Sequence, residues 1–220
     1  MVEIDEIKRK IIFAANELFM KYGIRSVTMD DIARQLGISK KTIYQSFSDK
    51  DEIVQAVNKL HQASWDEECS KVFSATSNAI EELIQFSIIF RKAITTMNPG
   101  VMFDMFKYHR KTWDDWNRYK RDILRQRVVD TIERGKKDGS FREEVNPEIL
   151  AIMRIEQVDM AFNDQLFPRE RFSFEEVQMQ LFDHFIYGCL TRKGKDQYEE
   201  SKRHLLESET TPIVKWENYI

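Results

Sequence analysis

The stretch VTMDDIARQLGISKKTIYQSFSDK, residues 27–50, decides the fold of the first part of this chain. Its pattern predicts two short helices joined by a tight turn. Thr28 and Asp31 have the spacing of a capping box at the start of the first helix. Gly37 follows the last apolar residue of that helix, and glycine ends helices because it adopts a positive φ at little cost. Ser39 then stands where the N-cap of the second helix is expected.

The second predicted helix has one apolar side and one side rich in hydrogen-bond donors. Ile43 and Phe47 are one turn apart and are expected to face inward. The outward side carries Lys40, Lys41, Thr42, Tyr44 and Gln45. Donors near a helix N-terminus suit phosphate, and a helix-turn-helix places its second helix in the major groove. The sequence therefore predicts a helix-turn-helix unit.

Composition agrees with an all-α protein that has a sizeable core. The chain has 220 residues, of which 42% are hydrophobic and 32% charged, and it contains only seven Gly and four Pro. Long periodic segments with so few turn residues favour helices over a turn-rich β fold. The formal net charge is -3, so any nucleic-acid site must be a local patch of positive charge.

The periodic segments predict an N-terminal three-helix helix-turn-helix domain followed by a larger C-terminal helical bundle, with about nine helices in all. The first helix is expected from about Ile4 to Tyr22, and a long helix is expected at residues 111–137. We predict a helix-turn-helix domain at 1–50, a ligand-binding and dimerisation bundle at 51–192, and a polar C-terminal extension at 193–220.

At this point the residues resemble a known family. The segment TMDDIARQLGISKKTIYQSFSDKDEIV, preceded by AANELFMKYGIRSVT, closely resembles the DNA-binding domain of the TetR family of bacterial transcription regulators. The resemblance covers about residues 8 to 58, roughly a quarter of the chain. Later in the chain, GKKDGSFR (residues 135–142) resembles the turn between two C-terminal helices of that family.

The resemblance implies a homodimer with three N-terminal helices for DNA and about six more for ligand binding and dimerisation. It also implies a repressor that leaves its operator when a small molecule enters the bundle. Among the matching positions, Lys50 and the hydroxyls of Thr28 and Tyr44 would meet backbone phosphates. Lys and Gln side chains of the second helix would read base edges. The full predicted DNA-binding set is Thr28, Ser39, Lys40, Lys41, Thr42, Tyr44, Gln45 and Lys50.

Aromatic and methionine residues in the middle of the chain admit two interpretations. They line a cavity for an apolar or aromatic effector, or they are ordinary core. Taken one at a time, the core interpretation is favoured, whereas the group as a whole makes an effector pocket worth testing. The members are Phe86, Phe90, Met102, Phe103, Phe106, Trp113, Trp116 and Phe162.

A broad apolar stripe near the end of the chain also admits two interpretations. It forms a dimer seam with a second copy, or it packs inside the monomer. We favour the seam, because two-fold symmetry lets a helix-turn-helix protein reach two half-sites. The stripe consists of Val177, Leu181, Phe182, Phe185, Ile186 and Cys189.

Several other functions find no support in the residues. The two cysteines and four histidines have no metal-ligand spacing, and we expect no cofactor. No phosphate-binding loop or nucleophile motif is present, so we expect no enzyme. No apolar run approaches the roughly 20 residues that a membrane helix needs, and we expect a cytoplasmic protein.

Two functions from different classes follow. The leading hypothesis is a dimeric, sequence-specific transcriptional repressor that binds a double-stranded DNA operator and is released by a small-molecule effector. The alternative is a DNA-bound structural or division-control protein whose C-terminal domain binds a protein partner. A sealed bundle without an effector response would favour the alternative.

Overall fold

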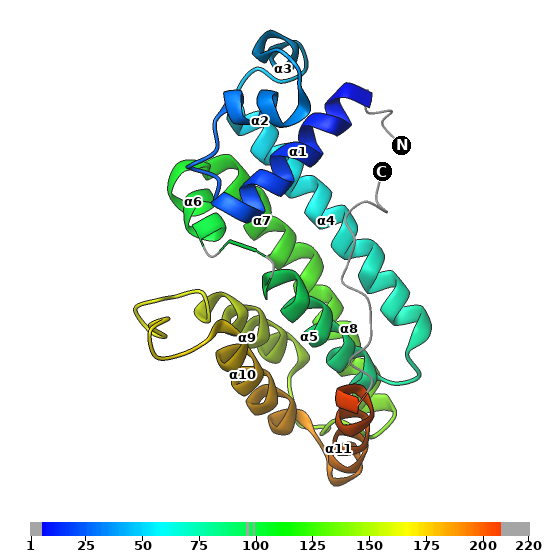
Figure 1. Ribbon diagram of the computed structural model, residues 1–220. Helices are drawn as coiled ribbons and strands as arrows, with labels where there is room; N and C mark the ends of the chain where they lie inside the picture. Colours follow the sequence, from blue (N-terminus) through cyan, green and yellow to red (C-terminus); the bar gives the residue numbers. More distant parts are fainter. Residues whose placement is uncertain (1–5, 96, 99, 208–220) are drawn as a thin grey trace. The chain divides into compact units, whose positions relative to one another are not determined.

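The computed structural model describes residues 6–95, 97–98 and 100–207, and this part of the chain is built from helices (Figure 1). An all-α fold with an N-terminal helix-turn-helix is confirmed. The α-helices are α1 (Glu6–Tyr22), α2 (Met29–Leu36), α3 (Lys40–Ser46), α4 (Lys50–Ala75), α5 (Ala79–Thr95), α6 (Gly100–Tyr108), α7 (Arg110–Tyr119), α8 (Arg125–Lys137), α9 (Pro147–Met160), α10 (Phe174–Cys189) and α11 (Arg192–Glu207).

The helix predicted at residues 111–137 contains a π-helical turn. Helices α7 and α8 are joined without a break by the turn η1 (Lys120–Leu124). The backbone N–H of Arg125, the residue after η1, donates to the carbonyl oxygen of Lys120, five residues earlier. The predicted start at Ile4 and residues 208–220 of the predicted extension lie outside the described residues.

The described chain forms two compact units. The N-terminal unit comprises residues 1–66 and 96–117, and the C-terminal unit comprises residues 67–95 and 118–215, each as far as it is described. Helix α4 therefore contributes its first part to one unit and its last part to the other. This grouping differs from the predicted limits at residues 50 and 192, which stay predictions about domains.

The core of the N-terminal unit joins the first four helices to α6. Ile11, Ile32, Ile43 and Ile53 have no exposed surface, and they belong to one cluster of buried apolar side chains. Val101 and Met105 of α6 complete this cluster. Burial of this kind stabilises the fold by about 1.5–3 kcal/mol per large aliphatic side chain. Two short helices alone would not bury enough surface to be stable.

Polar contacts also attach the α6 region to the first helices. The backbone N–H of Asn98 donates to the carbonyl oxygen of Met20 at 2.8 Å. The backbone N–H of Arg25 donates to Oδ2 of Asp104, also at 2.8 Å. These contacts make α6 part of the unit that carries the helix-turn-helix, whereas its aromatic residues were candidates for a ligand pocket or for ordinary core.

Helices α5, α8, α10 and α11 share the core of the C-terminal unit. Ile80, Ile132, Phe141, Ile186 and Tyr198 are almost fully buried there and belong to one cluster. Because the first and last of these side chains are 118 positions apart, the sequence pattern alone did not show that they meet.

Glycine is required within the predicted 135–142 turn. Helix α8 continues through Gly135 to Lys137, where the helix was predicted to end, and Gly139 at φ +77° makes the turn. A Cβ at Gly135 would lie 2.4 Å from Cδ2 of Phe141. The missing side chain therefore lets the Phe141 ring pack directly on the helix backbone.

Candidate nucleic-acid interface

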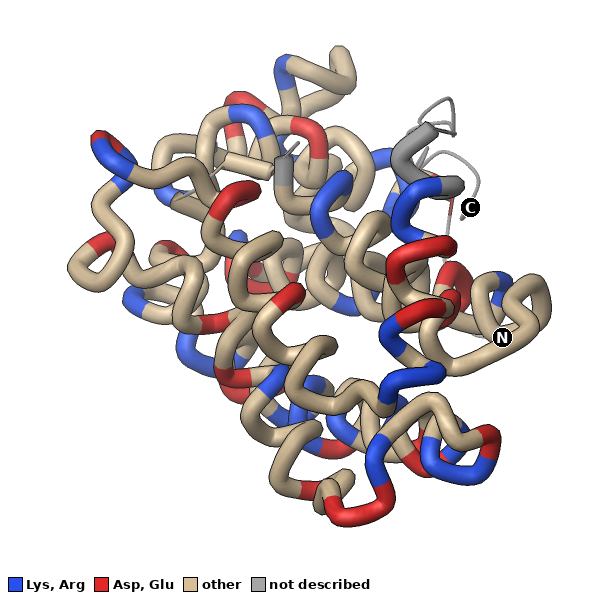
Figure 2. The backbone as a smooth tube through the Cα atoms, turned by 90° about the horizontal axis from the view of Figure 1, so that it is seen from below, with Lys and Arg blue, Asp and Glu red and all other residues tan. Residues whose placement is uncertain are grey.

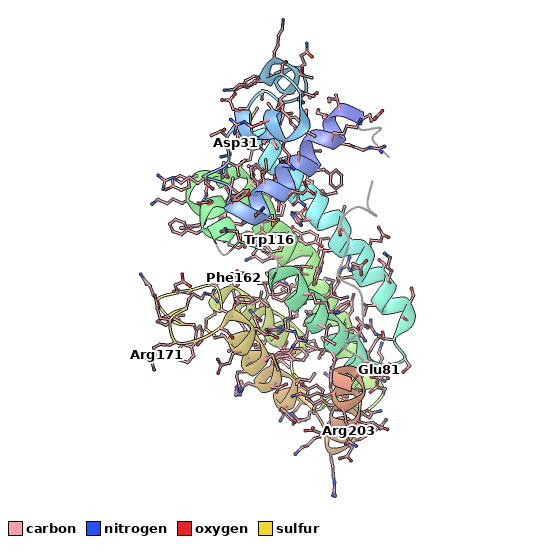
Figure 3. The ribbon with its side chains drawn as sticks, in the orientation of Figure 1. Asp31, Glu81, Trp116, Phe162, Arg171 and Arg203 are labelled. Carbon is pink, nitrogen blue, oxygen red and sulfur yellow. The ribbon has the colours of Figure 1, made fainter. Side chains whose placement is uncertain are left out.

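Local hydrogen bonds hold the two helices of the motif in place. Thr28 and Asp31 form the predicted capping box: the Asp31 N–H donates to Thr28 Oγ1 at 3.2 Å, and the Thr28 N–H donates to Asp31 Oδ2 at 2.9 Å. The hydroxyl and backbone N–H of Thr28 lower the pKa of the Asp31 carboxyl below its usual value. Gly37 adopts φ 65° and ends α2, as predicted. Figure 3 labels Asp31 in the first turn of α2.

Helix α3 separates a buried side from an exposed side. Ile43 is fully buried, and Phe47, just after the helix, is 2% exposed. Lys41, Tyr44 and Gln45 are exposed, with Tyr44 at 48%. Ser39 caps the helix by accepting from the N–H of Thr42 at 3.1 Å. Since the buried side fixes the rotation of the helix, the exposed side chains are held outward.

The two lysines at the start of α3 differ in their surroundings. Nζ of Lys40 lies 2.9 Å from Oδ2 of Asp30 on α2, and this hydrogen bond raises the pKa of Lys40. Such an exposed ion pair contributes little to stability, so phosphate can replace the carboxylate. Lys41 has no hydrogen bond or ion pair to any residue in the described ranges, which leaves its ammonium group available to DNA.

Lys50 is held by the protein itself. Its ammonium group donates to the carbonyl oxygen of Ile24 at 2.5 Å and lies 5.9 Å from the centre of the Phe19 ring. Partial burial lowers the pKa of Lys50. The predicted phosphate contact of Lys50 stays a prediction, but the structure gives this side chain a second role: it ties the start of α4 to the loop before α2.

The hydroxyls of Thr28, Ser39 and Thr42 are used within the motif. Oγ1 of Thr28 donates to Asp31 Oδ2 at 2.7 Å, and the Ser39 and Thr42 hydroxyls lie 2.8 Å apart. These oxygens still have acceptor capacity, but their geometry is set by capping. Of the predicted DNA-binding set, Lys41, Tyr44 and Gln45 are the side chains that structural contacts leave uncommitted.

Charge along the chain is mixed. Figure 2 shows segments with Lys or Arg and segments with Asp or Glu interspersed along the helices. Several basic residues of α7, η1 and α8 have carboxylate partners, for example Arg110 with Asp114 at 3.2 Å. These pairs favour a solvated helix face for the basic residues at positions 107–137.

The residues predicted for an effector pocket are divided between the two units. Met102, Phe103, Phe106, Trp113 and Trp116 belong to the N-terminal unit, and Phe86, Phe90 and Phe162 belong to the C-terminal unit. Phe103 and Phe106 are more than half exposed. Trp113 and Trp116 pack against the core of the N-terminal unit. The single pocket stays a prediction, and in the C-terminal unit only Phe86, Phe90 and Phe162 remain to line it.

The residues predicted for the dimer seam are mostly buried within the single chain. Val177, Phe182, Phe185, Ile186 and Cys189 are at most 6% exposed within the single chain, and only Leu181 keeps part of its surface. A side chain already covered by its own chain has no surface to offer a second copy. This burial favours the second of the two interpretations, packing inside the monomer, and the dimer seam stays a prediction.

Helix α9 presents an apolar face that the sequence analysis did not identify. Ile149, Ile152 and Met153 are 62%, 45% and 40% exposed and lie on one side of the helix, at spacings of three and four residues. The helix also has an inward apolar side, so its overall pattern shows little amphipathic contrast. That is why its outer face was missed.

Comparisons with known proteins agree with this geometry. Residues 11–57 match the family described as bacterial regulatory proteins, tetR family. An uncharacterised helix-turn-helix transcriptional regulator of Bacillus subtilis, YvaF, is 24% identical over 172 residues, which cover 78% of this chain and 90% of that protein. The match to the family lies on the residues that build α1 to the start of α4.

Solved structures share the fold over most of the chain. A transcriptional regulator from Cytophaga hutchinsonii has a TM-score of 0.70 at 20% identity, over 85% of this chain and 100% of that chain. A transcriptional regulator from Saccharomonospora viridis, solved with choline, has a TM-score of 0.62 at 22% identity, over 85% of this chain and 99% of that chain.

Residues 11–57 therefore form a DNA-binding domain of the tetR-family type. The chain is a DNA-binding transcriptional regulator, and α2 and α3 are its helix-turn-helix. The Bacillus subtilis relative is described as a regulator and not as an enzyme. Among the helices of the described ranges, none combines the length and apolarity that crossing a membrane requires.

Proposed function

We propose that this TetR-family regulator is a homodimeric repressor that holds its operator with α3 and leaves it when a small organic molecule binds the C-terminal unit. The observation that carries the proposal is the exposed row on α3. Lys41, Tyr44 and Gln45 point outward from a helix whose other side is fixed by Ile43, which is fully buried. The Lys41 ammonium and the Gln45 amide suit base edges, and the Tyr44 hydroxyl suits a phosphate.

The DNA contact is tested by removing single side chains from that row. An operator sequence is first selected from random DNA with the wild-type protein. Lys41→Ala and Tyr44→Ala should then each weaken binding by about tenfold or more, because one good base or phosphate contact is worth about 1–3 kcal/mol. Fluorescence anisotropy at fixed salt measures the change.

Lys59→Ala is the matched control for charge, because Lys59 is exposed on α4 in the same unit. It should bind the operator like the wild type. If Lys41→Ala and Tyr44→Ala also bind like the wild type while their circular dichroism is unchanged, α3 is not the recognition helix.

The proposed dimer uses the exposed face of α9. Two half-sites lie one helical turn apart, about 34 Å, so a single copy reaches only one of them. Ile149, Ile152 and Met153 form a face of the kind that a second copy covers. The occupant we propose is therefore the same face of a second copy, related by a two-fold axis.

Ile152→Glu should convert the dimer into a monomer, because a carboxylate at the centre of an apolar interface loses its hydration. Analytical ultracentrifugation measures the mass, and operator affinity should fall at least about tenfold because one half-site is lost. Ile123→Glu, at a residue 41% exposed in η1, is the control and should stay dimeric. A monomeric wild type, or a dimeric Ile152→Glu variant, would remove α9 from the proposal.

Release requires a connection between the bundle and the motif. The N-terminal unit includes α6. In the same unit, Nδ1 of His109, just before α7, lies 2.7 Å from Oδ1 of Asp51 at the start of α4. Both α4 and the α7–η1–α8 run continue into the C-terminal unit. A neighbour of this fold was solved with choline, which supports a small-molecule effector. A differential affinity of about 1–3 kcal/mol between two states is enough for such coupling.

A further inference from the structure

Arg154 of α9 points into the C-terminal unit and has no partner there. The residue is only 9% exposed, and its guanidinium lies 5.2 Å from the ring centre of Phe182 and 6.0 Å from that of Phe185. Within the described ranges it makes no hydrogen bond or ion pair, and its Nη1 is buried without an acceptor. Burial lowers the pKa of Arg154 to about 10, so the group stays charged at neutral pH.

The other buried charges of this unit are paired. Glu82 accepts from the Thr131 hydroxyl at 2.8 Å and from the Arg134 guanidinium. Lys120 forms an ion pair with Asp159. A buried charge costs several kcal/mol unless it is paired and hydrogen-bonded, and contact with an aromatic face offsets only part of that cost. Glu82 and Lys120 thus each have a partner of opposite charge, whereas Arg154 has no carboxylate partner in the described ranges.

Two amide oxygens without donors lie in the same region. Gln178, 5% exposed on α10, donates its Nε2 to the carbonyl oxygen of Val158 at 3.1 Å, which leaves its Oε1 buried and unpaired. Gln157, one turn beyond Arg154, also has a buried Oε1 without a donor. Gln178 stands one turn before Phe182, one of the rings beside Arg154. One strong donor on α9 and two acceptors, on α9 and α10, are thus buried without partners in this unit.

The site borders solvent at one end. Residues 157–160, at the end of α9, each keep partial exposure, whereas Ala151, one turn before Arg154, is fully buried. The part of this region nearest to solvent is therefore the end of α9 that carries Gln157.

We propose that Arg154, Gln157 and Gln178 bind the polar end of an organic acid, and that the apolar body of this acid lies against Phe182 and Phe185. The proposal rests on the proposed effector function and names its ligand class. A carboxylate matches the planar guanidinium fork with two parallel hydrogen bonds. It also carries one negative charge, which neutralises one guanidinium, whereas a phosphate dianion would leave a buried excess charge. The amide oxygens require a donor, which a hydroxyl next to the carboxylate supplies.

The test uses the full chain and one matched pair of probes, 3-hydroxyoctanoate and octane-1,3-diol. The first has the carboxylate and the hydroxyl, and the second is its neutral analogue. Titration calorimetry and thermal shift measure binding, since a ligand that binds only the folded state raises Tm. The wild type should bind the acid at least about tenfold more tightly than the diol, which corresponds to one charge-assisted pair.

Arg154→Met should remove this preference. Because it replaces a buried unpaired charge by an apolar chain of similar length, the variant without ligand should be as stable as the wild type or more stable. Arg154→Lys keeps the charge but loses the fork, and should weaken binding of the acid. Arg171→Met is the control: Arg171 also lies against an aromatic ring, 5.3 Å from that of Phe172, but it is exposed in the loop before α10 (Figure 3).

Operator binding is measured with each probe in parallel. One outcome is that the diol and the acid release DNA equally, both from the wild type and from Arg154→Met. The carboxylate site would then be wrong, and the effector-responsive repressor would stand. If the acid binds through Arg154 without changing operator affinity, the site stands and the release mechanism is wrong. If octanoate, 3-hydroxyoctanoate and 4-phenylbutyrate all fail to bind the wild type, the inference is overturned.

Discussion

The helix-turn-helix and the α9–α10 pair both have residues whose type suggests a function, but their sequence patterns were informative to different degrees. In the helix-turn-helix, the side chains predicted to point outward, such as Lys41 and Tyr44, are exposed. In α10, the stripe predicted to face a second copy is buried in its own chain, while the exposed apolar face lies on α9. Periodicity shows which residues share a face, but it does not show what covers that face.

The largest effect is expected from a cavity beneath the recognition helix. Ile43→Ala should destabilise the N-terminal unit by about 2–4 kcal/mol, because Ile43 is fully buried. Trp113 and Trp116 pack against that core, so urea unfolding followed by tryptophan fluorescence in a Trp216→Phe background reports this unit. Tyr44→Ala, on the exposed side of the same helix, should leave the midpoint nearly unchanged. Equal losses from both variants would contradict the division of α3 into two sides.

The matched test in the C-terminal unit uses two glycines. Gly135→Ala should cost about 1–3 kcal/mol, because the added Cβ meets the Phe141 ring. Gly188→Ala, at an exposed position of α10 with nothing within 4 Å of the added Cβ, should instead stabilise the helix by about 0.5–1 kcal/mol. Thermal unfolding followed by circular dichroism measures both. A stable Gly135→Ala variant would show that the Phe141 contact is not as close as described.

The smallest effect is expected from pH, which should change the stability of the N-terminal unit through His61. Nε2 of His61 donates to Oδ1 of Asn16 at 2.7 Å in the N-terminal unit, and the surrounding protein lowers the pKa of His61 to about 4. His61 in the unfolded state binds a proton as pH falls through about 6.5, whereas His61 in the folded state stays neutral until about pH 4. The free energy of unfolding is therefore highest above pH 6.5 and decreases as pH falls toward 4. Between pH 7.5 and 5 the loss should be about 1–2 kcal/mol.

His61→Gln keeps a donor for Asn16 but does not titrate, and it should remove this part of the pH dependence. The measurement is the fluorescence-detected urea midpoint at the two pH values for wild type and variant. Identical pH profiles for wild type and variant would mean that the pKa of His61 in the folded protein is close to its ordinary value.

Single residues show which features could be predicted from the sequence and which could not. The caps at Thr28, Gly37 and Ser39 were correctly predicted, because capping depends on atoms no more than a few residues away. The roles of Lys50 and of α6 were not foreseen. The carbonyl that Lys50 binds is 26 residues earlier, and the backbone N–H that meets Asp104 is 79 residues earlier. Contacts at that separation leave no mark on local periodicity.

By itself, therefore, the sequence determined an all-α chain, the caps of its short helices and the outward face of α3. Only the tertiary structure decided that the α10 stripe is core, that α9 carries the exposed apolar face, and that Arg154 is buried without a counter-charge. The physical reason is that helix geometry is set by interactions within about one turn, whereas burial and charge pairing depend on what other segments bring alongside.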